Sequence, residues 1–202
     1  MNGAEDLWLI EWRVGDDLLS VIEPTPSEIA RAAPALAAFY NDEHNREMMT
    51  HEEEFSAEDV ESYYDELRAD GGRPLLLRAG PRGDELAGDA DLRNIEDATG
   101  EFAIMVGARA TQGRGLGTRF AIMAHAFAFG VLGLARVYVS IIPTNAASRR
   151  LFEKLGYEAD DSPEARELAD EDSDLTLSLP RERFEAERQR ELGEIRLRQR
   201  EI

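Results

Sequence analysis

Glycine occupies every second position in one short stretch of the chain, Gln112-Gly113-Arg114-Gly115-Leu116-Gly117-Thr118. Such a loop lets several backbone N–H groups turn toward one anion, and the Arg114 side chain can add positive charge. The apolar, proline-free stretch 120–132 predicts a helix after the loop, whose N-terminal dipole would strengthen an anion site. The preceding segment 102–106 has strand character. This order of elements is typical of pyrophosphate binding, with an ordinary glycine-rich turn as the alternative.

Two common phosphate-binding motifs do not fit this loop. A Walker loop has Lys and then Ser or Thr after its last glycine, whereas Leu116-Gly117-Thr118 follows Gly115 here. The dinucleotide-binding motif spaces its glycines as G-x-G-x-x-G, and the spacing here is G-x-G-x-G. The spacing therefore disfavours a nucleotide-dependent enzyme, an alternative that predicts binding of ATP or NAD.

A second motif lies further along the chain, at residues 145–157 with the sequence NAASRRLFEKLGY. Together the two stretches resemble the GNAT superfamily of acyl-CoA-dependent N-acyltransferases. That family has a Q/R-x-x-G-x-G/A motif, matched here by Gln112, Gly115 and Gly117, followed by an Asn-led helix that ends in E-K-L-G-aromatic. Three short segments are also similar to the branch of ribosomal-protein N-terminal and spermidine acetyltransferases: 41–43, 55–58 and 100–102.

The resemblance implies a binding site for acetyl-CoA. It assigns the CoA pyrophosphate to the loop residues Gln112, Gly113, Arg114, Gly115, Leu116, Gly117 and Thr118. The strand that ends in Met105 and Val106 is expected to bulge and to direct a backbone N–H at the thioester carbonyl, a donor worth about 3 kcal/mol. Asn145 is expected to hold the pantetheine arm, and capping of the following helix is its alternative or simultaneous role.

Glu101 is the candidate base. An alkylamine with a pKa of about 10 arrives protonated, so a carboxylate near the acceptor would help to remove its proton. Glu101 opens the strand that meets the thioester, and its surroundings resemble the A-E-F-x-I segment of the same branch. A solvated carboxylate at a strand end is the alternative.

Phe152 departs from the family pattern, because many members have Tyr here as the acid that protonates the departing sulfur. A thiol with a pKa of about 8.5 leaves tolerably as the thiolate at neutral pH, but a missing acid costs about 10²-fold or more. Tyr138, on the strand beside the helix of Phe152, is the candidate substitute. Tyr157 is expected to pack in the core.

Hydrophobic periodicity predicts an α/β fold. Strands are expected at 7–14, 18–22, 74–79, 85–95, 101–106, 136–142 and 174–179, and helices at 28–40, 57–69, 120–132 and 145–155. Ser27 and Ser56 are the expected N-caps of the first two helices. These elements predict a mixed, largely antiparallel sheet of about seven strands flanked by helices, and the resemblance implies that it is splayed at the acyl-CoA site.

One GNAT domain is expected over 1–180, followed by a charged helical extension over 181–202. The extension is interpreted either as a solvated helix or as an arm that packs on a second subunit of a homodimer. The chain lacks Cys, has only three His and shows no long apolar run or basic N-terminus. We therefore expect no disulfide, no metal and no membrane segment, and a soluble cytoplasmic protein.

The net charge is −19. Residues 41–70 carry twelve Asp and Glu against two Arg, and residues 157–174 carry nine against one. In the resembled family these segments border the acceptor side, where negative charge would attract a cation such as a polyamine, an aminoglycoside or a basic peptide end and would repel nucleic acid. The favoured alternative is a genome that acidifies all its proteins, because Lys154 is the only lysine.

The sequence therefore predicts an acetyltransferase that uses acetyl-CoA and acetylates a primary amine by direct attack in a ternary complex. The alternative is a non-catalytic acyl-CoA-binding regulatory domain, in which Phe152 would mark lost chemistry.

Overall fold

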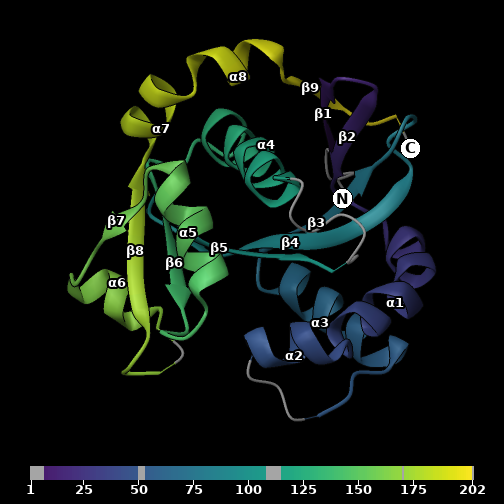
Figure 1. The fold of residues 1–202 in the computed structure, drawn as a ribbon, viewed down its shortest axis with the longest axis horizontal. Coiled ribbons are helices and arrows are strands. Elements are labelled where there is room, and N and C mark those ends of the chain that lie inside the picture. The colour runs from purple at the N-terminus through teal and green to yellow at the C-terminus, as the bar shows by residue number, and fades with distance from the viewer. Residues whose placement is uncertain (1–6, 50–52, 108–114, 170, 202) are drawn as a thin grey trace, which may run out of the picture.

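A computed structural model describes residues 7–49, 53–107, 115–169 and 171–201. Within these residues nine strands form one sheet in the order β7-β8-β6-β5-β4-β3-β2-β1-β9 (Figure 1). The strands are β1 (Trp8–Val14), β2 (Asp17–Ile22), β3 (Arg73–Ala79), β4 (Glu85–Glu96), β5 (Thr99–Val106), β6 (Arg136–Ile141), β7 (Glu158–Ala159), β8 (Leu175–Pro180) and β9 (Arg196–Gln199). The seven expected strands are present, and the two extra ones, β7 and β9, form the edges of the sheet.

The sheet is antiparallel except between β5 and β6, where it is splayed. These two strands pair over only three positions, from Thr99 with Arg136 to Glu101 with Tyr138. Beyond Glu101, β5 follows β4 as far as Val106, whereas β6 pairs with β8 on its other side. The expected splay, which is the gap between β5 and β6 beyond Glu101 and Tyr138, is therefore confirmed.

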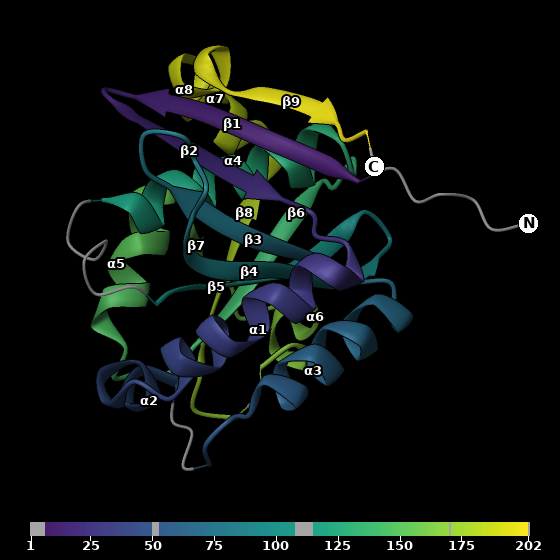
Figure 2. The ribbon, with the colours of Figure 1, turned by 90° about the vertical axis from the view of Figure 1, so that its right-hand side faces the viewer.

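Helices cover both faces of the sheet (Figures 1 and 2). α1 (Pro26–Tyr40), α2 (Glu43–Met49) and α3 (Ala57–Ala69) lie on one face, and α4 (Leu116–Gly130) and α5 (Ala146–Leu155) lie on the other. α4 is buried from Phe120 to Phe129 and forms the centre of the larger core. In the described part of the chain, none of the helices is both long and apolar enough to cross a bilayer.

The helix ends follow from their capping residues. Ser56 caps α3 as predicted, in a reciprocal capping box with Asp59. The cap of α1 is Thr25 and not Ser27, because Thr25 has extended backbone and shares a capping box with Glu28, while Pro26 takes the first helical position. Gly156 ends α5 in the left-handed conformation, as predicted.

Residues 181–201 form a C-terminal strap that crosses over α4 from β8 to β1 (Figure 1). The strap contains α7 (Arg181–Glu187) and α8 (Gln189–Glu194), and Phe184 and Ile195 pack into the core. The expected helix stops at Glu194, because the chain then pairs antiparallel with β1 as β9. The open edge of β1 outweighs the helical preference of this Arg- and Glu-rich sequence.

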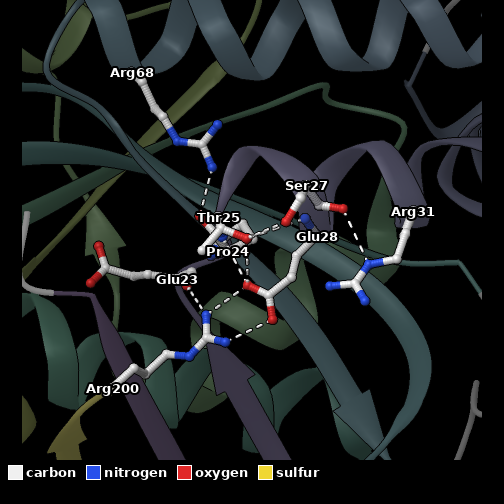
Figure 3. A network of polar contacts seen from close by, with 8 residues as sticks. All are labelled: Glu23, Pro24, Thr25, Ser27, Glu28, Arg31, Arg68 and Arg200. Carbon is white, nitrogen blue, oxygen red and sulfur yellow. Dashed lines mark hydrogen bonds and ion pairs between the residues drawn. The ribbon is translucent and has the colours of Figure 1, made fainter. Parts of the chain in front are cut away.

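Arg200 fastens the end of the strap to the start of α1 (Figure 3). Its guanidinium donates to the two carboxylate oxygens of Glu28 at 2.7 and 2.8 Å and to the carbonyl of Glu23 at 2.6 Å. Burial opposes the ionisation of Glu28, but hydrogen bonds from Arg200 and Thr25 outweigh it and lower the pKa of Glu28 to about 2.

Replacing Arg200 should therefore destabilise the protein. Arg200→Gln leaves the partly buried Glu28 carboxylate without its cation, and we expect the free energy of unfolding to fall by about 1–3 kcal/mol in chemical denaturation. Arg198→Gln is the matched control, because Arg198 is 63% exposed where it meets Glu11 and its loss should cost less than about 1 kcal/mol. Equal losses in the two variants would contradict this account of the strap.

Candidate active site

The first turn of α4 lies at the open end of the splay. A Cβ built on Gly117 would be 3.1 Å from Leu151 of α5 and 3.7 Å from the Val106 side chain of β5. Gly115, the N-cap, has a φ of 73°, a left-handed conformation that favours glycine. The N–H groups of Leu116, Gly117 and Thr118 have no acceptor within the helix, so this end of α4 presents donors and a positive dipole to an anion.

The other residues predicted for the anion site, Gln112, Gly113 and Arg114, lie outside the described residues. Their contribution to a pyrophosphate site stays a prediction.

The backbone of β5 forms one wall of the splay. Gly107 donates its N–H to Ala87 at 3.0 Å, and the antiparallel alternation turns the Met105 N–H toward β4 as well. The backbone groups of Ile104 and Val106 are directed to the opposite side, into the splay. Of the two residues predicted to face the thioester, Val106 therefore has the suitable backbone direction.

The bulge expected near Met105 is not found there. Gly88 pairs with Val106 and Asp89 with Met105 in continuous register, and the irregularity in this ladder lies between Arg93 and Glu96. Alternation along a regular antiparallel pair is sufficient to direct an N–H into the splay.

Asn145 links the two sides of the splay through α2. Its Oδ1 accepts the Ser148 N–H at 3.0 Å, which is the capping role, and its Nδ2 donates to the carbonyl of Met48 at 3.0 Å. At the other side of α2, the buried Asn45 donates to the Gly107 carbonyl at 3.3 Å. The helix missed by sequence reasoning therefore bridges the end of β5 and the start of α5.

The aromatic residues predicted for sulfur protonation fall in two places. Phe152 is buried between Phe102 and Tyr157, with ring centroids 6.3 and 5.1 Å away. Tyr157 also lies in the core, as expected, with its hydroxyl 2.6 Å from Nε2 of the buried His125. Tyr138 stands beside Glu101 at the closed end of the splay, and burial raises its pKa.

A cavity of about 410 Å³ lies over β4 and β5, between the sheet and α1 and α3. Its walls are mostly aromatic and aliphatic, and its polar residues are concentrated on β4. The lining residues are Tyr40, Phe55, Asp59, Val60, Tyr63, Asp89, Ala90, Asp91, Arg93, Ala103, Ile104 and Met105.

Two buried aspartates line this cavity. Asp89 and Asp91 are 4% and 6% exposed. Oδ2 of Asp89 accepts hydrogen bonds from the hydroxyls of Tyr40 and Tyr64, and Oδ2 of Asp91 accepts one from Tyr63 at 2.9 Å. In the described structure Oδ1 of each has no hydrogen-bond partner, although Nε of Arg93 lies 3.9 Å from Oδ1 of Asp91.

Burial raises the pKa of both aspartates to about 6. The tyrosine hydrogen bonds partly oppose this shift at Asp89, and the charge of Arg93 opposes it at Asp91. Both carboxylates are thus ionised at neutral pH but lie close to protonation, a property suited to proton transfer.

Glu101, the base predicted from sequence, does not line the cavity. It is 3% exposed, and its two oxygens accept hydrogen bonds from Nη2 of Arg93 and Nδ2 of Asn94, each at 2.9 Å. The sequence did contain a signal for Asp89 and Asp91, because two acids at alternate positions of an apolar strand must share one face.

The acidic segments contribute unequally to the cavity. Of 41–70, Phe55, Asp59, Val60 and Tyr63 line it, whereas its lining includes no residue of 157–174.

A family model described as the acetyltransferase (GNAT) domain matches residues 24–158. The chain belongs to the GNAT acetyltransferase family. No curated protein matches the sequence.

Solved structures share the fold of this GNAT domain at low sequence identity. *Mycobacterium smegmatis* RimJ in complex with CoA-disulfide is 19% identical over 93% of this chain and 95% of its own, with a TM-score of 0.71. The aminoglycoside acetyltransferase AAC(6')-Ib with coenzyme A is 19% identical over 84% and 99%, with a TM-score of 0.66. Spermidine N-acetyltransferase from *Vibrio cholerae* with CoA and spermine is 18% identical over 82% and 97%, with a TM-score of 0.66.

The buried Asp89 should make stability depend on pH in a defined direction. Its pKa rises from 3.8 to about 6 on folding, so its contribution to stability is full below pH 3.8 and is lost as the pH rises through 6. Asp89→Asn removes this titration. Relative to the variant, the free energy of unfolding of the wild type should therefore fall by up to about 3 kcal/mol between pH 4 and pH 7.5.

Denaturant unfolding of both proteins at several pH values measures this difference. The acid end is an internal control, because a protonated Asp and an Asn are nearly isosteric. If the difference in unfolding free energy between the wild type and Asp89→Asn does not change with pH, the burial of an ionisable Asp89 is contradicted.

Proposed function

We propose that this GNAT domain transfers an acetyl group from acetyl-CoA to a primary amine by direct attack in a ternary complex. One observation carries the proposal: β5 borders both of the sites that such a reaction needs. Its edge and the first turn of α4 border the splay, and its residues 103–105 line a cavity with two buried carboxylates. An acyl donor and an amine can therefore approach the same strand from different sides.

In this proposal the splay holds the acyl donor. The first turn of α4, with Gln112, Gly113 and Arg114, would hold the pyrophosphate. Asn145 would orient the pantetheine arm, for which its bond to the Met48 carbonyl would have to be exchanged. The Val106 N–H would stabilise the charge that develops on the thioester oxygen.

We assign the base to Asp89 in preference to Glu101. Asp89 pairs with Met105, at the level where the family motif leads us to expect the thioester, and one of its oxygens carries no hydrogen bond. Glu101 is instead held by Arg93 and Asn94, so we propose that it positions Arg93. The amine nitrogen would attack the thioester carbon, its proton would pass to Asp89, and the sulfur would leave as a thiolate.

Two solved neighbours support an amine acceptor of cationic character. AAC(6')-Ib has been solved with kanamycin, and the *Vibrio cholerae* spermidine acetyltransferase has been solved with spermine. The buried carboxylates offer this chain a matching charge. The second candidate function, an acyl-CoA-binding regulatory domain, is favoured only by Phe152, which places no acidic proton beside the sulfur.

Release of CoA thiol from acetyl-CoA tests the proposal. We expect turnover with at least one of spermidine, an aminoglycoside, an amino sugar and peptides that begin with Ala or Ser. Asp89→Asn should lower kcat/KM by about 10²-fold or more, because the proton acceptor is lost. Asp65→Asn, an equal charge change at an exposed position of α3, should have little effect.

Two results would change these assignments. A larger loss in Glu101→Gln than in Asp89→Asn, with both variants folded, would return the base to Glu101. Bound acetyl-CoA without turnover of any amine would favour the regulatory domain.

A further inference from the structure

We propose that the cavity selects an acceptor with two cationic nitrogens, one held by Asp89 and the other by Asp91. This inference rests on the proposed function, because it specifies the acceptor of that reaction. Asp89 and Asp91 are two residues apart on one face of β4, which places their Cβ atoms about 7 Å apart. The favoured ligand is therefore a diamine whose nitrogens are separated by about the same distance.

Each aspartate is fixed separately, so the geometry points to two ammonium positions. Tyr40 of α1 and Tyr64 of α3 hold one oxygen of Asp89, and Tyr63 holds one oxygen of Asp91. The second oxygen of each is buried and lacks a hydrogen bond in the described structure. A buried carboxylate oxygen without a donor is costly, and an ammonium group supplies both the donor and the opposite charge.

The charges around the cavity also match a dication. Arg93 is paired with Glu101 at 2.9 Å, which neutralises both and leaves Arg93 poorly available for a carboxylate on the ligand. Asp59 also lines the cavity, but its carboxylate accepts the hydrogen bonds of the capping box of α3. The charges of Asp89 and Asp91 then remain, with Arg93 no closer than 3.9 Å to Asp91. Two ammonium groups would balance them, whereas the carboxylate of an amino acid would meet no unpaired cation among the described lining residues.

The cavity walls suit the carbon chain between the nitrogens. Phe55, Val60, Ala90 and Ala103 are apolar and lie among the lining residues. Tyr63 is 37% exposed while its hydroxyl holds Asp91, so its ring is available to a methylene chain or to a cation. Because Asp89 pairs with Met105 and Asp91 with Ala103, Asp89 would bind the reacting nitrogen and Asp91 the second one.

Titration calorimetry at pH 8 tests the inference without requiring turnover. The ligands are α,ω-diamines of three to eight carbons and the monoamines of equal chain length. Wild-type protein should bind the best diamine about tenfold or more tightly than its matched monoamine. The optimum should lie at roughly four or five carbons, where the nitrogens are about 7 Å apart. Equal affinity for diamines and monoamines at every length would overturn the inference.

Asp91→Asn separates the two nitrogen positions. It should reduce the preference for diamines to less than about threefold while it leaves monoamine binding nearly unchanged. Asp65→Asn is the matched control, because it makes the same charge change on the exposed side of α3 and should keep the preference. If Asp65→Asn lowers the preference as much as Asp91→Asn does, long-range charge and not the Asp91 position is responsible, and the inference fails.

Thiol release with the same ligands distinguishes this inference from the proposed function. Selective diamine binding that is lost in Asp91→Asn, without acetylation of any amine, would support the inference and overturn the proposed function. Acetylation of diamines and monoamines with equal kcat/KM would support the proposed function and overturn the inference.

Discussion

The fold depends on the end of pairing between β5 and β6 at Glu101. A strand edge inside a sheet carries backbone donors and acceptors that must find other partners. The surrounding elements hold this edge open, because α4 begins beside Val106 and α2 is tied to Gly107 and to Asn145 on either side. The unpaired backbone groups are thereby confined to the gap between β5 and β6. This gap is where we place the acyl donor.

A second energetic cost arises on the sheet face that α1 and α3 cover. Asp89 and Asp91 are buried there among apolar side chains. Two ionised carboxylates in such surroundings destabilise the folded state, and the tyrosines of α1 and α3 offset only part of that cost. Both helices are therefore part of the acceptor site that we propose. α1 is secured at its opposite end by Glu28 and Arg200, so a strap at the end of the chain stabilises the helix that carries Tyr40. Stability sacrificed at one place for function is a common property of active sites.

Local sequence signals predicted much of this arrangement. The alternating glycines indicated a turn into a helix, although α4 begins at Leu116, four residues before the expected start. Ser56 marked the start of α3, and the two family motifs indicated the fold and the acyl-CoA family. Signals that depend on distant partners were missed or misread. The Arg- and Glu-rich sequence of β9 favours a helix, and only the edge of β1 makes it a strand.

The same limitation explains the prediction for the base. Glu101 stood at a plausible position in the sequence, but its partner Arg93 comes from the neighbouring strand. The alternation of Asp89 and Asp91 along the strand places both on one face, but the environment of Asp89 becomes clear only when Tyr40, 49 residues earlier in the chain, is seen to donate to one of its oxygens. Local sequence can therefore locate a strand and its faces, whereas the pairing of its charges depends on the tertiary structure.

Hydrogen exchange of the backbone amides, with and without CoA, tests the central claim most directly. If the splay binds the acyl donor, CoA should slow exchange at Ile104 and Val106 and in the first two turns of α4, and leave β9 unchanged. A second cavity, of about 460 Å³, is lined by Trp8, Arg68 and Arg73 among others. If CoA leaves exchange of the β5 amides unchanged and slows exchange around this second cavity, the central claim is contradicted. That result would move the cofactor to the other end of the sheet.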